Sequence, residues 1–118
     1  MMAEEKVQMT ARKVNQNTSI IDIQGEINAF AENVLMDAYT QATSQGAKNI
    51  ILNFTQLAYM NSSGIGLLVT LLIRANRQKQ SLVAYGLTDH YKQIFELTRL
   101  NESIKIYPGE QAAIAATG

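Results

Sequence analysis

The sequence of 118 residues contains no cysteine, one proline and one histidine. Without cysteine, neither a disulfide framework nor a thiolate metal site can form. The only proline is Pro108, so no proline-rich linker divides the chain. The length fits one domain, which we expect to span residues 1–118 with its folded core in residues 6–117.

An excess of charge of one sign is also missing, because ten Lys and Arg residues balance ten Asp and Glu residues. The densest basic cluster is formed by Arg74, Arg77 and Lys79, and it is typical of the solvated C-terminal end of a helix. Proteins that bind nucleic acid normally carry a basic stripe. We therefore expect no nucleic-acid partner.

No long hydrophobic run is present. The longest apolar stretch, Ile65 to Ile73, has nine residues and is interrupted by Gly66 and Thr70. A helix that spans a bilayer needs about 20 apolar residues. Residues 1–10 contain two acidic residues and no apolar run, unlike a secretory signal peptide. These absences predict a cytoplasmic protein without a membrane partner.

Hydrophobic residues nevertheless make up 47% of the chain, an ordinary value for a globular protein. Apolar and polar residues alternate in residues 6–14, and residues 18–24 form a second apolar segment that ends at Gly25, which together predict an antiparallel hairpin. Apolar residues at helical spacing predict a helix at 30–44. The remaining expected elements are a strand at 48–54, a connecting loop at 55–61, a helix at 62–78, a strand at 81–87, a helix at 89–99, a strand at 103–107 and a helix at 109–117.

This order, β-β-α-β-α-β-α-β-α, predicts the α/β class. Strands that alternate with helices imply parallel strands joined by crossovers, and the opening hairpin makes the sheet mixed. We expect a mostly parallel sheet of four or five strands. Because such crossovers are right-handed, the helices should lie mainly on one face.

The most informative segment is Tyr59 to Leu68 (YMNSSGIGLL), where a helix is expected to begin. Asn61 and Ser62 are both favourable N-cap residues, and the glycines could serve close packing. Glycine inside a helix costs about 1 kcal/mol relative to alanine, however, and two glycines in the first turn suggest that bare backbone is needed near another group. A helix N-terminus also suits a phosphate group. Simple capping and a functional role both remain open at this point.

Known catalytic motifs do not fit the chain. No glycine lies two residues before either serine, as a nucleophile elbow requires, and Val69 stands where a dinucleotide fingerprint needs a small residue. A serine–histidine pair would depend on His90 alone. The acidic residues show no metal-ligand spacing. We therefore expect no enzymatic activity, no catalytic residue, no metal and no cofactor.

The segment Met60 to Leu67 (MNSSGIGL) resembles the signature of the STAS domain, specifically that of the bacterial anti-sigma factor antagonists. Their pattern is Asp-Ser-Ser/Thr-Gly-Leu/Ile-Gly after a buried strand. Gly25 to Asn28 (GEIN) resembles a second signature, Gly-x-Leu/Ile-Asp, and Ile50 to Phe54 resembles the strand before the serine loop. The resemblance covers residues 6–117 in order and spacing, and it implies a STAS-like single domain.

The resemblance implies a switch controlled by phosphorylation. In the family, the serine directly after the Asp is phosphorylated; that position is Ser62 here, and Ser63 is the second candidate. The kinase is an anti-sigma factor with a histidine-kinase-like fold, and the unphosphorylated antagonist binds it and frees the sigma factor. A metal-dependent serine phosphatase resets the switch, and we expect a monomer or weak dimer. The implied partner-binding residues are Asn28, Asn61, Ser63, Gly64, Ile65, Gly66 and Leu67.

Two features bear on this interpretation. Both family aspartates are amides here, Asn28 and Asn61, which accept hydrogen bonds but carry no charge. The expected helix at 62–78 is apolar nearly all round, so it either lies deep in the core or presents part of its surface to a partner. Two alternative functions remain open. The chain could be a scaffold subunit of a larger signalling complex, or a STAS component that binds lipid or a small molecule.

Overall fold

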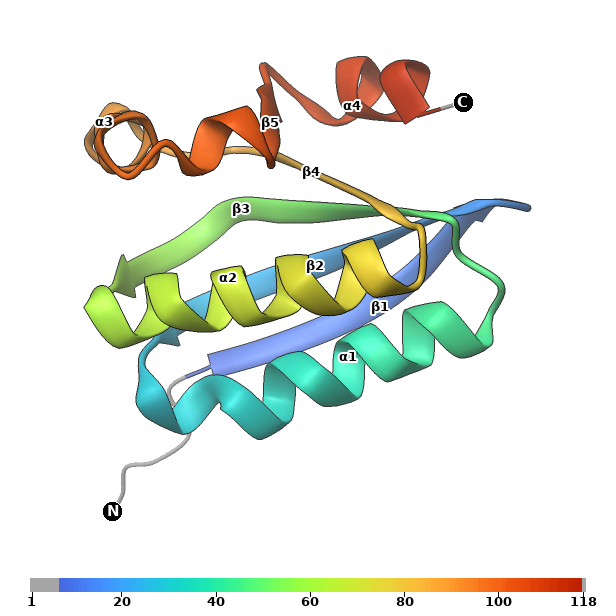
Figure 1. Cartoon of the computed structure of the whole chain (residues 1–118), viewed down its shortest axis with the longest axis horizontal. Coiled ribbons are helices and arrows are strands. Elements are labelled where there is room, and N and C mark those ends of the chain that lie inside the picture. The colour runs from blue at the N-terminus through green and yellow to red at the C-terminus, as the bar shows by residue number, and fades with distance from the viewer. Residues whose placement is uncertain (1–6, 118) are drawn as a thin grey trace.

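A computed structural model describes residues 7–117 (Figure 1), and its helices and strands occur in the predicted order. Residues 1–6 and 118, which belong to the expected single domain, lie outside the described residues; Lys6, the predicted start of the first strand, is among them. The elements are β1 (Val7–Asn15), β2 (Thr18–Ile27), the 3-10 turn η1 (Ala29–Ala31), α1 (Glu32–Ser44), β3 (Asn49–Met60), α2 (Ser62–Arg77), β4 (Ser81–Tyr85), α3 (Asp89–Leu97), the 3-10 turn η2 (Leu100–Glu102), β5 (Lys105–Tyr107) and α4 (Glu110–Thr117).

The five strands form one sheet in the order β1-β2-β3-β4-β5. The hairpin partners β1 and β2 are antiparallel, and each of the other neighbouring pairs is parallel. The predicted mixed, mostly parallel sheet of the α/β class is therefore confirmed. Because β2, β3 and β4 are parallel, the C-terminal ends of β2 and β3 lie at the same edge of the molecule, where α2 begins.

The helices lie mainly on one face of the sheet, as predicted. Helices α1, α2 and α3 contribute to the large core on one face, for example through Leu35, Leu68 and Phe95. Helix α4 covers the other face, where Ala113 packs against a smaller cluster that contains Ile20 and Ile51. In Figure 1, α1 and α2 run side by side beneath the sheet, and α4 lies on the opposite side.

Helix α4 is held to its face of the sheet by a polar network. Arg12 of β1 donates hydrogen bonds to Asp22 of β2 (2.6 Å) and to Glu110 of α4 (2.8 Å). Asn53 also donates to Asp22, and the Tyr85 hydroxyl donates to Glu110. Although partial burial disfavours the charged form, the hydrogen bonds from Arg12 and Asn53 hold the pKa of Asp22 below its ordinary value. Hydrogen bonds from Arg12 and Tyr85 likewise lower the pKa of Glu110.

The predicted connecting loop at 55–61 is wrong, because β3 continues through Met60. The extension pairs in parallel with the end of β2, which itself continues past Gly25 to Ile27 rather than ending there. Register shifts interrupt this part of the ladder, and Gly25 adopts a positive φ of 100°. The irregularities and the solvent exposure of most residues from 55 to 59 remove the apolar pattern by which a strand is recognised.

Candidate phosphorylation and docking site

Residues 61–64, here called the serine turn, lie where β3 passes into α2. Asn61 is the N-cap of α2: its backbone is extended, and its side-chain oxygen accepts a hydrogen bond from the backbone N–H of Gly64 (3.0 Å). Ser62 and Ser63 are the first two residues of the helix, and both are exposed. Within residues 7–117, neither serine hydroxyl takes part in a hydrogen bond to another side chain or to the backbone. Both serines therefore lie at the surface with hydroxyls that are free of internal hydrogen bonds in this range.

The second signature lies directly against the serine turn. Asn28 caps η1, since its side-chain oxygen accepts a hydrogen bond from the backbone N–H of Phe30 (2.9 Å). The backbone N–H of Asn61 donates to the carbonyl oxygen of Ile27 (3.2 Å), so the two capped turns are joined through one hydrogen bond. The amide side chains of Asn28 and Asn61 thus perform the capping for which an aspartate would also serve.

The two glycines of the serine signature have different surroundings. Gly64 is buried, and a Cβ atom there would lie 2.5 Å from the carbonyl oxygen of Ile27 and 2.7 Å from Cγ of Met60. Glycine at this position is required for α2 to approach the end of β2. A Cβ atom at Gly66 would meet nothing within 4 Å. Packing within the described chain therefore does not require glycine at position 66, although glycine disfavours the helix.

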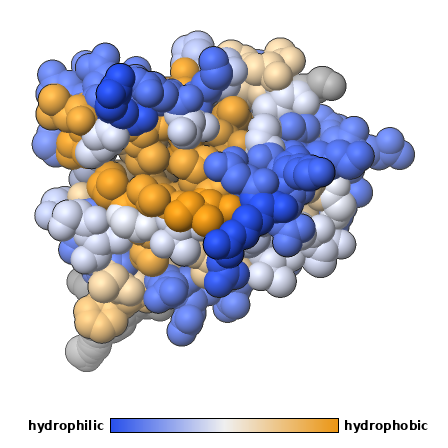
Figure 2. Space-filling model, in the orientation of Figure 1, coloured by the Kyte–Doolittle hydropathy of each residue, from blue (hydrophilic) through white to orange (hydrophobic). Residues whose placement is uncertain are grey.

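Helix α2 buries one stripe and exposes another. Its buried residues are Gly64, Leu68, Leu71 and Ala75. On the outside, Val69 is 39% exposed and Ile73 is 46% exposed, and Ile65 is half-buried. Ile65, Val69 and Ile73 follow one another at intervals of four residues, so they form one row along the helix, here called the outer row. Figure 2 shows a band of hydrophobic surface over α2, with hydrophilic surface at the C-terminal end of the helix.

The other expected site residues are distributed around the start of α2. Leu67 is half-buried, and Gly66 is exposed. His90 lies at the beginning of α3 with its ring edge-on to that of Tyr91, at a centroid distance of 4.9 Å. No hydrogen bond between His90 and either serine is present in the described part of the chain.

Two residues near the serine turn belong to no motif identified in the sequence. The Phe30 side chain, in η1, is 92% exposed beside the second signature. The hydroxyl of Tyr91 accepts a hydrogen bond from the backbone N–H of Met60 (2.9 Å), one residue before the Asn61 cap. A buried tyrosine on a helix is usually a core residue, and only the contact across 31 positions reveals its second role.

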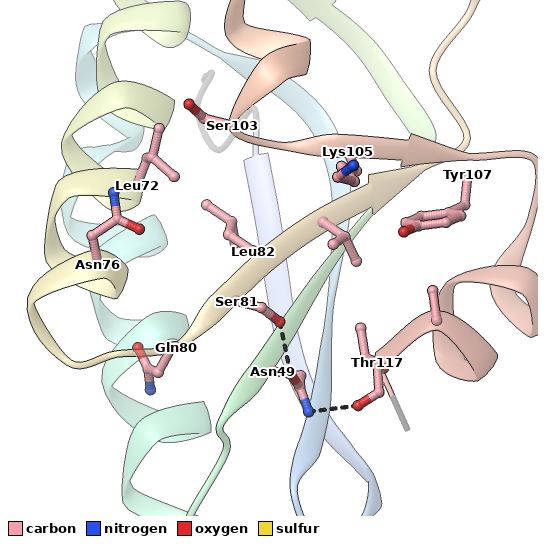
Figure 3. Close-up of a pocket in the computed structure, with 12 residues that line it drawn as sticks. Asn49, Leu72, Asn76, Gln80, Ser81, Leu82, Ser103, Lys105, Tyr107 and Thr117 are labelled. Atoms are coloured by element: carbon pink, nitrogen blue, oxygen red, sulfur yellow. Dashed lines mark hydrogen bonds between the residues drawn. The ribbon is translucent and has the colours of Figure 1, made fainter.

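A cavity of about 370 Å³ lies at the other end of β3, between α2, the strands β4 and β5, and α4 (Figure 3). Several of its polar side chains are engaged with one another: Ser81 donates to Asn49 (2.7 Å), and Asn49 donates to the carbonyl oxygen of Thr117 (2.9 Å). These contacts fasten the end of α4 to the sheet. Because the cavity lies at the start of β3 and the serine turn follows the end of β3, the two are separate.

Residues 7–117 contain neither a helix that could span a membrane nor a cluster of metal-ligating side chains. No helix among them is both long and apolar enough to cross a membrane. In the same range, His, Asp and Glu side chains form no group of three or more that could hold a metal ion.

Comparison with known proteins identified a family and several relatives. The family model for the STAS domain matches residues 9–113. An anti-sigma-B factor antagonist of Listeria monocytogenes is 33% identical over 94 residues, which cover 77% of this chain and 82% of the relative. An anti-sigma-B factor antagonist of Staphylococcus aureus is 26% identical over 91 residues, covering 77% of this chain and 84% of the relative.

A solved structure has the same fold. The phosphorylated form of the Bacillus cell fate determinant SpoIIAA superimposes with a TM-score of 0.72 and 21% identity, over 93% of this chain and 99% of that one. At this level of identity the likeness supports the fold.

Proposed function

Because the chain belongs to the STAS domain family, we propose that it is an anti-sigma factor antagonist whose binding is controlled by phosphorylation of Ser62. In the unphosphorylated form, the serine turn and α2 dock onto an anti-sigma factor that is also a serine kinase. The observation that carries the proposal is the exposed Ser62 hydroxyl at the first position of α2, at the start of the exposed outer row. The kinase supplies the chemistry, so the proposed role requires no catalytic residue in this chain.

The switch follows from the charge of the phosphate. A phosphoserine carries about −1.5 to −2 charges at neutral pH. Burying that charge against an apolar partner surface costs several kcal/mol unless it is paired, and each 1.4 kcal/mol changes affinity about tenfold. We expect phosphorylation of Ser62 to weaken binding by about a hundredfold or more.

The fold of the antagonist itself tolerates the phosphate. Ser62 lies at the N-terminus of α2, where the helix dipole favours a negative charge. The nearest signature side chains, Asn28 and Asn61, are neutral amides and do not repel it. Phosphorylation should therefore act on the interface rather than on the stability of the domain.

The choice of Ser62 over Ser63 rests on the signature, since both serines are exposed. The partner-binding surface in this proposal comprises Asn28, Asn61, Ser63, Ile65, Gly66 and Leu67 together with Val69 and Ile73, whereas the buried Gly64 serves it indirectly through packing. A metal-dependent serine phosphatase removes the phosphate and resets the switch, and the antagonist works as a monomer or weak dimer.

Phosphorylation in vitro tests the proposal. The chain and its Ser62→Ala, Ser63→Ala and Ser44→Ala variants are incubated with Mg-ATP and a histidine-kinase-like anti-sigma factor from the same genome, and the products are mapped by mass spectrometry. Ser44 is an exposed serine at the end of α1 and serves as the matched control. Phosphate should appear on Ser62 in every chain except Ser62→Ala. Phosphate on Ser63 alone, or on neither serine, would refute the assignment.

A further inference from the structure

The end of β3 has a strand on one side only. Its residues pair with β2 as far as Met60, but β4 ends at Tyr85, which lies opposite Asn53. Residues 54–60 of β3 therefore extend beyond the last partner in β4. A strand edge without a neighbour leaves backbone N–H groups that need another acceptor.

Tyr91 supplies that acceptor at the last residue of the strand. The backbone N–H of Asn61 points toward β2 and donates to Ile27 (3.2 Å), whereas the backbone N–H of the preceding Met60 donates to the hydroxyl of Tyr91 (2.9 Å). Both donors belong to the two residues immediately before Ser62. The serine turn is consequently held from both sides, by β2 and by α3, and Figure 1 shows α3 at the end of the sheet where β3 terminates.

The hydroxyl and the ring of Tyr91 have separable roles. The ring is buried in the large core together with Phe95, and a phenylalanine would keep this packing. The hydroxyl joins α3 to the backbone of Met60, just before the serine turn. Met60 is itself buried, so water is a poor substitute for the lost acceptor.

We propose that Tyr91 is a positioning residue for Ser62: its hydroxyl fixes the end of β3 and so the direction in which the serine hydroxyl is presented to the kinase. This inference rests on the proposed phosphorylation of Ser62. Phosphoryl transfer depends on an accurately placed hydroxyl, and a small displacement of a reacting group lowers the rate steeply. Tyr91 does not touch the kinase, and it acts only through the backbone of Met60.

Comparison of Tyr91→Phe with Tyr85→Phe tests the role. Tyr85 is also buried and also loses one hydrogen bond on substitution, to Glu110, but it lies on the α4 face of the sheet. With the kinase that phosphorylates the unaltered chain, we expect Tyr91→Phe to lower kcat about tenfold and to change KM less than twofold, because the outer row is intact. Tyr85→Phe should leave both constants unchanged. A general loss of stability would affect both variants alike, and thermal unfolding measures it.

Amide hydrogen exchange provides a test without the kinase. In the unaltered chain, the Met60 amide should be protected as strongly as paired amides of β3, although no strand lies beside it, and Tyr91→Phe should remove this protection while Tyr85→Phe keeps it. Rapid exchange at Met60 in the unaltered chain would overturn the proposal even if a variant failed to fold. Normal phosphorylation of Tyr91→Phe would refute the positioning role alone, whereas absence of phosphate on the unaltered chain would refute the proposed function and the role with it.

Discussion

Replacement of Gly66 by alanine should raise the thermal stability of the domain and lower its affinity for the anti-sigma factor. The position lies within α2 and is exposed, and an added Cβ atom meets nothing within 4 Å. Replacing glycine by alanine in a helix interior stabilises by about 1 kcal/mol, which corresponds to roughly 4 °C in Tm for a domain of this size. If a partner approaches the bare backbone one turn from Ser62, the same methyl group should lower its affinity about tenfold or more.

The matched control for this experiment is Gly64→Ala. Here the new Cβ atom would lie 2.5 Å from the carbonyl oxygen of Ile27, a backbone atom that cannot move aside cheaply. Overpacking of this kind costs about 1–3 kcal/mol, so Gly64→Ala should lower Tm. Thermal unfolding by circular dichroism and titration calorimetry with the anti-sigma factor measure the two quantities. Destabilisation by Gly66→Ala, or unchanged affinity in that variant, would refute the reasoning.

Two other perturbations follow from the same structure. Ile73→Ser, in the outer row, should leave Tm within a few degrees but reduce partner affinity. Leu97→Ser, at a position of α3 that is more exposed (84% against 46% for Ile73), should change neither Tm nor affinity. Calorimetric titration of both variants decides, and equal effects on affinity would remove the outer row from the interface. The lowered pKa values of Asp22 and Glu110 mean that their ion pairs with Arg12 stabilise the fold fully above about pH 5 and progressively less as the pH falls through the lowered values. Arg12→Met should flatten this acid dependence in urea unfolding curves, and an unchanged pH profile would contradict the role of the network in holding α4.

The regular elements could be predicted from the sequence because their apolar spacing is set by burial on one or both faces. The alternation in residues 6–14 and the helical spacing in 30–44 correspond to β1 and α1. The end of β3 could not be predicted in this way. Its residues from 55 to 59 pair with an irregular stretch of β2 and are mostly exposed. Backbone hydrogen bonding determines this part of the strand, and such bonding cannot be recognised from the pattern of side chains.

The candidate site was predictable where a local motif encodes it. The N-cap formed by Asn61 at the start of α2 follows from residues adjacent in the sequence. The contact between Tyr91 and Met60 joins positions far apart in the chain and depends on where β4 ends, so no local pattern indicates it. Helix α2 does not lie wholly in the core, since it buries one stripe and exposes Val69 and Ile73; contact of the exposed side with a partner stays a prediction.

The most direct measurement compares the affinity of one anti-sigma factor for the antagonist before and after stoichiometric phosphorylation of Ser62, with thermal unfolding of both forms measured in parallel. A loss of affinity of about a hundredfold or more, with an unchanged or higher Tm for the phosphorylated form, is the predicted result. Equal affinity of the two forms, or a phosphorylated form that has lost its fold, would contradict a switch that works by placing charge in the docking surface.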